Sequence, residues 1–353
     1  MDALCPNPRH PLLASSGVEL AIPVGSSEGI IQRLTETNRD MTAPPQLDHF
    51  WVRAVIVNYN GPGLTLRCVQ SLLEQDCVSQ LEIVVVDNQS SEENWRLLQQ
   101  DLVGYPVILH RSPKNLGYAG GINFGAKLQR DHSPEYILAL NSDITLSSAD
   151  AVRRLVAALR EDPRRVACSP LIRDRDCPVP PEATVQVRRL PNFWTELVVC
   201  SCWLRRTGFG RQLQRMHLYE DCLPYPIGTT LDCETINGAC FMMVRQFLEA
   251  VGYLDERPFL YMEEQILGAM ISARNATACL CTAVIADHIQ GASTGMRGRS
   301  RPLRREFQQA RSELFYLRHY AGTNWLGQGL FLLVRSIDLL LKTLGGQLLR
   351  ASR

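Results

Sequence analysis

Three polar residues follow an apolar run near the middle of the chain and could bind a cation. Asn141, Ser142 and Asp143 come directly after residues 136–140. Ligands of open α/β sheets bind at such strand ends. The Asp143 carboxylate can hold a hard cation such as Mg²⁺ or Mn²⁺, which in turn neutralises a diphosphate. His288, at the end of another apolar run, can give the same cation a neutral nitrogen ligand.

Polar groups of a different kind follow two earlier apolar runs. The first run, 52–57, leads through Val57 into Asn58 and Tyr59, and the next ends at Asp87. Parallel strands would bring these residues to one edge of a sheet. The Asp87 carboxylate can accept a hydrogen bond from a pyrimidine ring N–H there, while backbone groups near Asn58 can meet the edge of the base.

A glycine-rich stretch from Gly117 to Asn123 is predicted to lead into a helix. Such a turn allows close approach of a nucleotide and its phosphates. The order Gly117, Gly120, Gly121 departs from the dinucleotide fingerprint, and the chain contains no P-loop sequence. Dehydrogenases and P-loop ATPases therefore lose support.

Two adjacent carboxylates, Glu263 and Glu264, stand at a predicted helix start. Neighbouring side chains on a helix point in different directions, so one carboxylate can contact an acceptor hydroxyl while the other caps the helix or positions a neighbouring group. A base for attack on an anomeric carbon must lie opposite the leaving diphosphate, and partial burial would raise its pKa usefully.

Each of these residues also has an ordinary structural explanation. Asp87 and Asp143 suit turns and helix caps, and His288 suits a buried position with a satisfied hydrogen bond. Glu263 and Glu264 would interact favourably with a helix N-terminus. Their joint occurrence at the ends of elements favours a shared site.

The elements that must position these residues alternate between buried strands and amphipathic helices from Val52 onward. This alternation predicts an α/β fold with a mostly parallel sheet and right-handed crossovers. Strands are predicted at 52–57, 81–86, 106–110, 136–140, 166–171 and 282–286, and helices at 65–74, 94–102, 120–128, 149–159 and 262–273.

The ordered series of motifs closely resembles glycosyltransferase family 2, and more narrowly its rhamnosyltransferase-like members that build bacterial surface polysaccharides. The resemblance spans about residues 52–295. The motifs lie at 57–60, 86–90, 115–123, 140–143, 237–240, 252–256 and 259–264.

The resemblance implies a GT-A fold, with a Rossmann-like sheet flanked by helices, and inversion at the anomeric carbon. It implies a UDP- or dTDP-sugar donor, with rhamnose as a candidate sugar, and Mg²⁺ or Mn²⁺ as cofactor. By position, Asp143 and His288 would bind the metal, and Glu264 would be the general base. The donor would be bound by Val57, Asn58, Tyr59, Asp87, Gly117, Asn123, Asn141 and Ser142.

The chain departs from the family pattern at two motifs. Asn141-Ser142-Asp143 contains one carboxylate, which makes His288 more important for metal binding. Glu263-Glu264 stands where many relatives have Glu-Asp, so the choice of base between them stays open.

Charge and cysteine content bear on partners and compartment. Lys+Arg 37 against Asp+Glu 36 gives a net charge of +1, and no nucleic-acid partner is expected. We interpret the 12 cysteines as reduced thiols in a cytoplasmic protein, since no secretory signal is recognisable.

We expect three regions along the 353 residues. Residues 1–48 form a disordered tail, within which Met41 is an alternative start. Residues 49–295 form the catalytic domain, with a nucleotide-sugar part at 49–171, an irregular insertion at 173–230 and an acceptor part at 231–295. Residues 296–353 form a basic, helical C-terminal region.

The C-terminal region combines basic and apolar residues. An arginine-rich run precedes an apolar helix at 325–344, whose polar residues recur on one face. This pattern suits a helix lying in the interface of an anionic membrane, at the inner face of the cell membrane, close to a glycan or lipid-linked acceptor. The alternative is packing on the catalytic domain or in a homodimer. The arginines are Arg297, Arg299, Arg301, Arg304 and Arg305, and the polar residues are Gln328, Arg335, Asp338 and Lys342.

Two other functions compete with glycosyl transfer. A sugar-nucleotide nucleotidyltransferase is disfavoured because residues 58–66 contain no Arg or Lys to hold a triphosphate. A catalytically silent, membrane-associated sugar-nucleotide-binding protein would be favoured if the insertion blocked the site.

Overall fold

The computed structural model describes residues 47, 49–130, 133–289 and 303–351. Nearly all of the predicted tail lies outside these ranges, as do Arg297, Arg299 and Arg301. The statements below concern the described residues.

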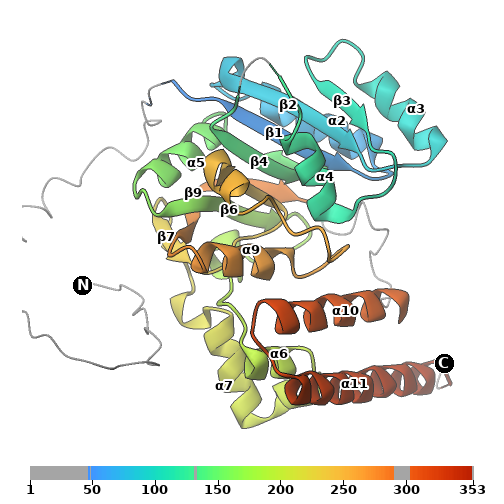
Figure 1. Cartoon of the computed structure of the whole chain (residues 1–353). Helices are drawn as coiled ribbons and strands as arrows, with labels where there is room; N and C mark the ends of the chain where they lie inside the picture. The colour runs from blue at the N-terminus through green and yellow to red at the C-terminus, as the bar shows by residue number, and fades with distance from the viewer. Residues whose placement is uncertain (1–46, 48, 131–132, 290–302, 352–353) are drawn as a thin grey trace, which may run out of the picture. The chain divides into compact units, whose positions relative to one another are not determined.

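Four parallel strands form the first half of the sheet, in the order β3-β2-β1-β4 (Figure 1). Their register pairs Asn58 with Asp87 and Val57 with Asn141, so the predicted donor residues reach one edge. The elements are β1 (Val52–Asn58), α2 (Pro62–Leu73), β2 (Leu81–Asp87), α3 (Glu92–Asp101), β3 (Ile108–Arg111), α4 (Gly117–Ala126) and β4 (Tyr136–Asn141).

The second half of the sheet is mixed, continuing from β4 through β8, β6 and β9 to β5, with β7 also paired to β9. β8 runs antiparallel to β4, so the parallel arrangement predicted from the sequence holds mainly for the first half. The elements are β5 (Ile144–Leu146), α5 (Ala151–Arg160), β6 (Arg165–Asp174), β7 (Thr230–Cys233), β8 (Cys240–Val244), α8 (Arg245–Ala250), α9 (Glu263–Ser272) and β9 (Thr277–His288).

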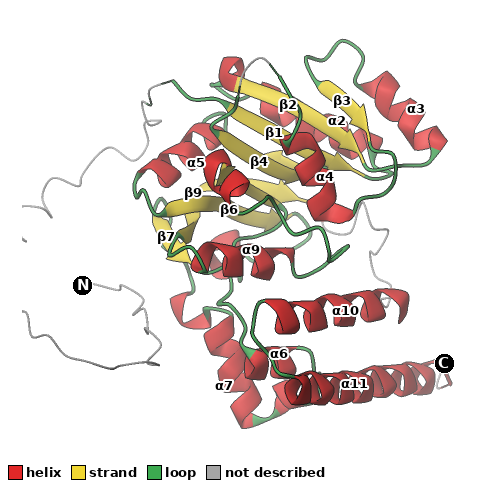
Figure 2. Cartoon of the chain, in the orientation of Figure 1, coloured by secondary structure: helices red, strands yellow, loops and turns green. Residues whose placement is uncertain are grey.

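Helices cover both faces of the sheet (Figure 2). Successive side chains of a strand point to opposite faces, and in β1 the side chains of Ala54 and Ile56 join the core under α2 and α5. Val55 points the other way, into the core under α4 and α9. Burial on both faces explains the continuous apolar runs in the sequence.

The segment 173–230, predicted to be irregular, contains two α-helices, α6 (Phe193–Val199) and α7 (Gly208–His217). Each begins with a side-chain cap: Asn192 accepts from the Thr195 N–H, and Thr207 accepts from the Gly210 N–H. The three short 3₁₀ turns of the segment are η2 (Pro181–Ala183), η3 (Leu204–Arg206) and η4 (Glu220–Cys222). The expectation of an irregular insertion therefore fails at 193–199 and 208–217.

The C-terminal region forms α10 (Leu303–His319) and α11 (Trp325–Ala351), which lie next to each other and to α6 (Figure 1). A third apolar core joins α6, α9, α10 and α11. No helix among the described residues is long and apolar enough to cross a membrane.

Cysteines mostly behave as predicted. Ten are free thiols and the majority are buried. Cys222 is disulfide-bonded, so the expectation of reduced thiols fails at that position.

Candidate active site

The Asp87 carboxylate lies at the carboxyl end of β2 and is fully buried. Its Oδ1 accepts hydrogen bonds from Asn58 Nδ2 at 2.8 Å and from Ser90 Oγ at 2.5 Å. Its Oδ2 accepts from the Ser90 N–H at 3.2 Å. Both predicted residues, Asn58 and Asp87, therefore belong to one preformed polar cluster, whereas Tyr59 is exposed at its rim.

Arg111 is a member of this cluster that the sequence reasoning missed. Its Nε lies 3.3 Å from Asp87 Oδ2, and its guanidinium stacks over Trp95 at 5.3 Å. The signal was available, because Arg111 ends β3 and pairs in register with Asp87. A cation beside the base-recognition carboxylate can also contact an oxygen of the nucleotide.

The glycine-rich turn lies between Asn88, which follows β2, and the loop before α9. Gly117 has φ +74°, and a Cβ there would approach the Phe259 carbonyl oxygen to 2.2 Å, so only glycine fits. Asn88 Nδ2 donates to the Gly117 carbonyl at 2.9 Å. Asn123 is buried and bonds the Leu254 backbone in both directions, so here its amide anchors a loop instead of lining open space.

Asp143 and His288, predicted as metal ligands, lie together. β5 pairs with β9 so that Ile144 faces His288, which places Asp143 Oδ1 3.2 Å from His288 Nε2. Asp143 is 4% exposed, and its Oδ1 has no hydrogen-bond partner among the described residues. A buried carboxylate oxygen without a partner is costly unless a ligand completes it.

These two side chains fit a divalent cation that takes its other ligands elsewhere. Within the described part of the chain, no group of three or more His, Cys, Asp or Glu side chains could hold a metal alone. Mg²⁺ commonly binds through one or two carboxylates plus substrate phosphates and water. Asp143 with His288 matches that arrangement.

The two adjacent glutamates have different environments at the start of α9. Glu264 accepts the Gly238 N–H on Oε1 at 2.6 Å, and its Oε2 pairs with Arg188 at 3.1 Å. Glu263 accepts the Tyr261 N–H at 2.8 Å. Burial raises the pKa of Glu263 to about 7, and the charge of Glu264 adds to the shift. The structure thus separates two carboxylates that are equivalent in the sequence.

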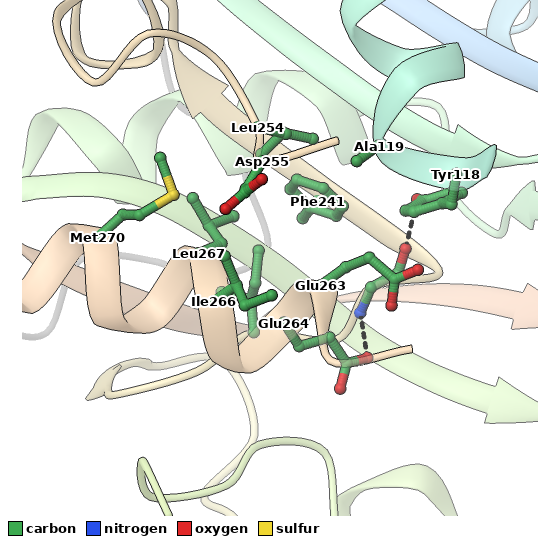
Figure 3. Close-up of a pocket in the computed structure, with 12 residues that line it drawn as sticks. Tyr118, Ala119, Phe241, Leu254, Asp255, Glu263, Glu264, Ile266, Leu267 and Met270 are labelled. Carbon is green, nitrogen blue, oxygen red and sulfur yellow. Dashed lines mark hydrogen bonds between the residues drawn. The ribbon is translucent and has the colours of Figure 1, made fainter. Parts of the chain in front are cut away.

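Tyr118 connects the glycine turn to the other motifs. Its hydroxyl donates to the Gly238 carbonyl at 2.5 Å, next to the bond between Gly238 and Glu264 (Figure 3). Burial raises the pKa of Tyr118 most, and the carboxylates of Glu263, Glu264 and Asp143 raise it further. Three of the four acids predicted for the site therefore lie within electrostatic reach of one phenol.

A pocket lies between α4, the loop after α8 and α9 (Figure 3). Tyr118, the two glutamates and several apolar side chains line it. Its walls combine carboxylates with a largely apolar floor around a small cavity of about 10 Å³. The lining residues include Tyr118, Gly238, Asp255, Glu263, Glu264 and Met270.

Known proteins resemble the chain in the same region. Residues 54–219 match the model of glycosyl transferase family 2. The chain is 27% identical to the low-salt glycan biosynthesis hexosyltransferase Agl10 of Haloferax volcanii, over 59% of each chain. It is 29% identical to the N-acetylglucosaminyl-diphospho-decaprenol L-rhamnosyltransferase of Mycobacterium tuberculosis, over 61% of this chain and 68% of the relative.

Other matches cover less of the relative. The chain is 32% identical to the chondroitin synthase of Escherichia coli over 31% of its own length, which is 16% of that protein. The crystal structure of GalNAc-T7 with UDP, GalNAc and Mn²⁺ superposes with a TM-score of 0.53 at 16% identity, over 77% of this chain and 48% of that one. The motifs, the sheet order and the family match agree: residues 54–219 belong to glycosyl transferase family 2, and the fold is GT-A.

Proposed function

We propose that the protein is an inverting, metal-dependent glycosyltransferase that moves a sugar from a UDP- or dTDP-sugar to a glycan or lipid-linked acceptor in cell-surface polysaccharide synthesis. The observation that carries the proposal is the buried Asp143 carboxylate, whose Oδ1 lies 3.2 Å from His288 Nε2 at the sheet edge that also holds Asp87.

The donor's nucleotide is assigned to the edge formed by β1 and β2. Asp87 would accept the pyrimidine ring N–H, and Arg111 would contact the ring or ribose side. Because Asp87 already binds Asn58, Ser90 and Arg111, donor entry must exchange one of these bonds for a bond to the base. Rhamnose remains the candidate sugar, supported by the similarity to the mycobacterial L-rhamnosyltransferase.

Asp143 and His288 would hold Mg²⁺ or Mn²⁺ against the donor diphosphate. When bound, the cation supplies positive charge that stabilises the leaving diphosphate. Asn141 and Ser142 precede Asp143 at the same strand end and would line this part of the donor site.

Glu264 is assigned as the general base. The acceptor hydroxyl oxygen attacks the anomeric carbon, the bond from that carbon to the diphosphate oxygen breaks, and the hydroxyl proton passes to the Glu264 carboxylate. Gly238 and Arg188 orient that carboxylate from two sides. Glu263, whose pKa burial raises to about 7, is the alternative base, and Glu264 is preferred because two groups orient its carboxylate.

The acceptor is assigned to the pocket beside α9, and we place the protein on the cytoplasmic face of a membrane that carries a lipid-linked acceptor. The support for this placement is that Glu264, the assigned base, lines the pocket.

Two measurements on the full chain test the proposal. Thermal denaturation with a panel of UDP-, dTDP- and GDP-sugars, with Mg²⁺ or Mn²⁺, should show a raised Tm for a donor of one nucleotide class. Donor hydrolysis should fall at least ~10³-fold in Glu264→Gln while donor stabilisation persists, and Glu93→Gln, an exposed glutamate on α3, should keep full activity.

The outcomes separate the competing functions. No stabilisation by any donor would refute the proposal. Stabilisation without hydrolysis or transfer would favour a catalytically silent binding protein, for which the engagement of both Glu264 oxygens is the supporting observation.

A further inference from the structure

The outward face of α11 is almost entirely apolar. Eight large apolar side chains between residues 325 and 341 are exposed, from 38% at Ile337 to 77% at Trp325. No charged side chain lies among the exposed residues of this stretch. The eight are Trp325, Leu326, Leu330, Leu332, Leu333, Ile337, Leu340 and Leu341.

The charged face of the same helix is turned inward. Arg335 is 3% exposed and Asp338 is fully buried. Arg335 lies 3.1 Å from Glu313, 3.3 Å from Glu306 and 3.3 Å from Asp338. A surface helix of a globular protein normally shows the reverse pattern, with its apolar stripe toward the core.

The buried ion pairs fix this inverted orientation. Asp338 also accepts the Cys202 N–H at 2.7 Å, and Lys342 lies 2.9 Å from Asp338. Turning α11 to hide its leucines would carry Arg335 and Asp338 away from these partners and leave Glu313 buried without its cation. Removing one partner of a buried pair is strongly destabilising, by about 3–5 kcal/mol. The apolar face is therefore held outward.

The charge of the region indicates what covers that face. Residues 296–353 contain eleven basic and three acidic residues, a net charge of +8 in a chain whose total is +1. All three acids, Glu306, Glu313 and Asp338, belong to the buried cluster. Exposed charge on α10 is consequently basic, at Arg304, Arg311 and Arg318.

We propose that the outward face of α11 binds the surface of a bilayer containing anionic lipids, with the helix lying in the interface. Leucines and a tryptophan enter the boundary of the acyl chains while nearby arginines meet lipid phosphates. A second copy of the chain is a weaker occupant, because a symmetric contact would bring two regions of +8 together. The inference rests on the proposed function for its purpose, since it holds the active site near a lipid-linked acceptor.

Vesicle co-sedimentation of the full chain tests the surface directly. Wild type should bind vesicles of phosphatidylcholine with 30% phosphatidylglycerol. Binding should be weaker to vesicles of phosphatidylcholine alone, and weaker to the mixed vesicles at 0.5 M salt. Leu333→Glu with Leu340→Glu should lower the vesicle partition coefficient at least ~10-fold. The matched control, Leu97→Glu with Val103→Glu, changes two exposed apolar residues far along the chain and should leave binding unchanged.

Light scattering and donor-induced Tm shifts on the same samples complete the experiment. Both double variants should be monomeric and should keep the wild-type Tm and donor response, which separates loss of docking from loss of folding or of the donor site. Unchanged vesicle binding in the α11 variant would overturn the proposal. So would a wild-type dimer that this variant dissociates, because the face would then be a contact between copies.

Discussion

Carboxylates are buried in two regions of this protein, and their partners differ. At the sheet edge, the ion-pair partner of Asp143 among the described residues is the imidazole of His288, 3.2 Å away, and no guanidinium or ammonium pairs with it. In the helical layer of α6, α10 and α11, the acids surround the Arg335 guanidinium. Buried charge left incomplete marks a place for a ligand, whereas buried charge paired within the protein sets the orientation of a helix.

The largest expected effect is at the incomplete site. Asp143→Asn should lower donor hydrolysis at least ~10³-fold, because the variant loses the only carboxylate of its motif for the cation. The Tm should stay within a few degrees of wild type, since the removed charge has no protein hydrogen bond to lose.

The controls for this change sharpen the comparison. Asp221→Asn, at an exposed position, should leave both activity and Tm unchanged. Mn²⁺ should raise the Tm of wild type in the presence of UDP more than that of Asp143→Asn. Activity of Asp143→Asn within tenfold of wild type would remove the residue from metal binding.

The paired site should respond in the opposite way. Arg335→Met should lower the unfolding free energy by about 3–5 kcal/mol, because Glu313 and Asp338 lose their cation while buried. Urea denaturation measures the change. Arg318→Met, at an exposed position on α10, should cost under ~0.5 kcal/mol. A loss below ~1 kcal/mol for Arg335→Met would show that the cluster does not hold α11.

The sequence was sufficient at the sheet edge for a physical reason. Each apolar run of strand length ends in a polar residue. If the strands are parallel neighbours, Asn58, Asp87 and Asn141 must meet at one edge, and the observed pairing is parallel. Asp143 and His288, predicted as ligands of one cation, lie 3.2 Å apart because of the antiparallel register of β5 and β9. That register is set by pairing between strands distant in the sequence and not by a local pattern.

Long-range contacts of irregular segments could not be predicted in the same way. Arg188 lies in a stretch without helical or strand periodicity, so nothing local connects it to Glu264. The periodicity of α11 correctly gave two faces, but a helical pattern alone does not say which face packs inward. That choice depends on acids from α10, which the sequence pattern of α11 does not reveal.

The ion pair between Arg188 and Glu264 can be tested for an effect on the reaction rate. Arg188→Met should lower kcat about 10- to 30-fold, because Glu264 loses one of the two contacts that orient it. KM for the donor should stay within twofold, since the side chain of Arg188 contacts Glu264, the assigned base. Steady-state kinetics measure the split.

Rescue by the conservative variant distinguishes positioning from a structural role. Arg188→Lys should recover part of kcat, because an ammonium can still pair with Glu264. Arg211→Met, exposed on α7, is the control and should behave as wild type. An equal loss in KM and kcat with a lowered Tm would instead assign Arg188 to stability of the 173–230 segment.

Glu263 should affect the pH dependence of stability. Its pKa is raised from 4.5 to about 7 by burial, so the folded state keeps a proton that the unfolded state releases. Wild type should therefore lose roughly 3 kcal/mol of this contribution as the pH rises from 4.5 to above 7. Glu263→Gln keeps an acceptor for the Tyr261 N–H and does not titrate. Urea denaturation at pH 5 and pH 8 should show a smaller drop for Glu263→Gln than for wild type, whereas Glu93→Gln should match wild type. Equal drops in all three proteins would mean that Glu263 titrates like an exposed carboxylate, which would contradict a pKa of about 7.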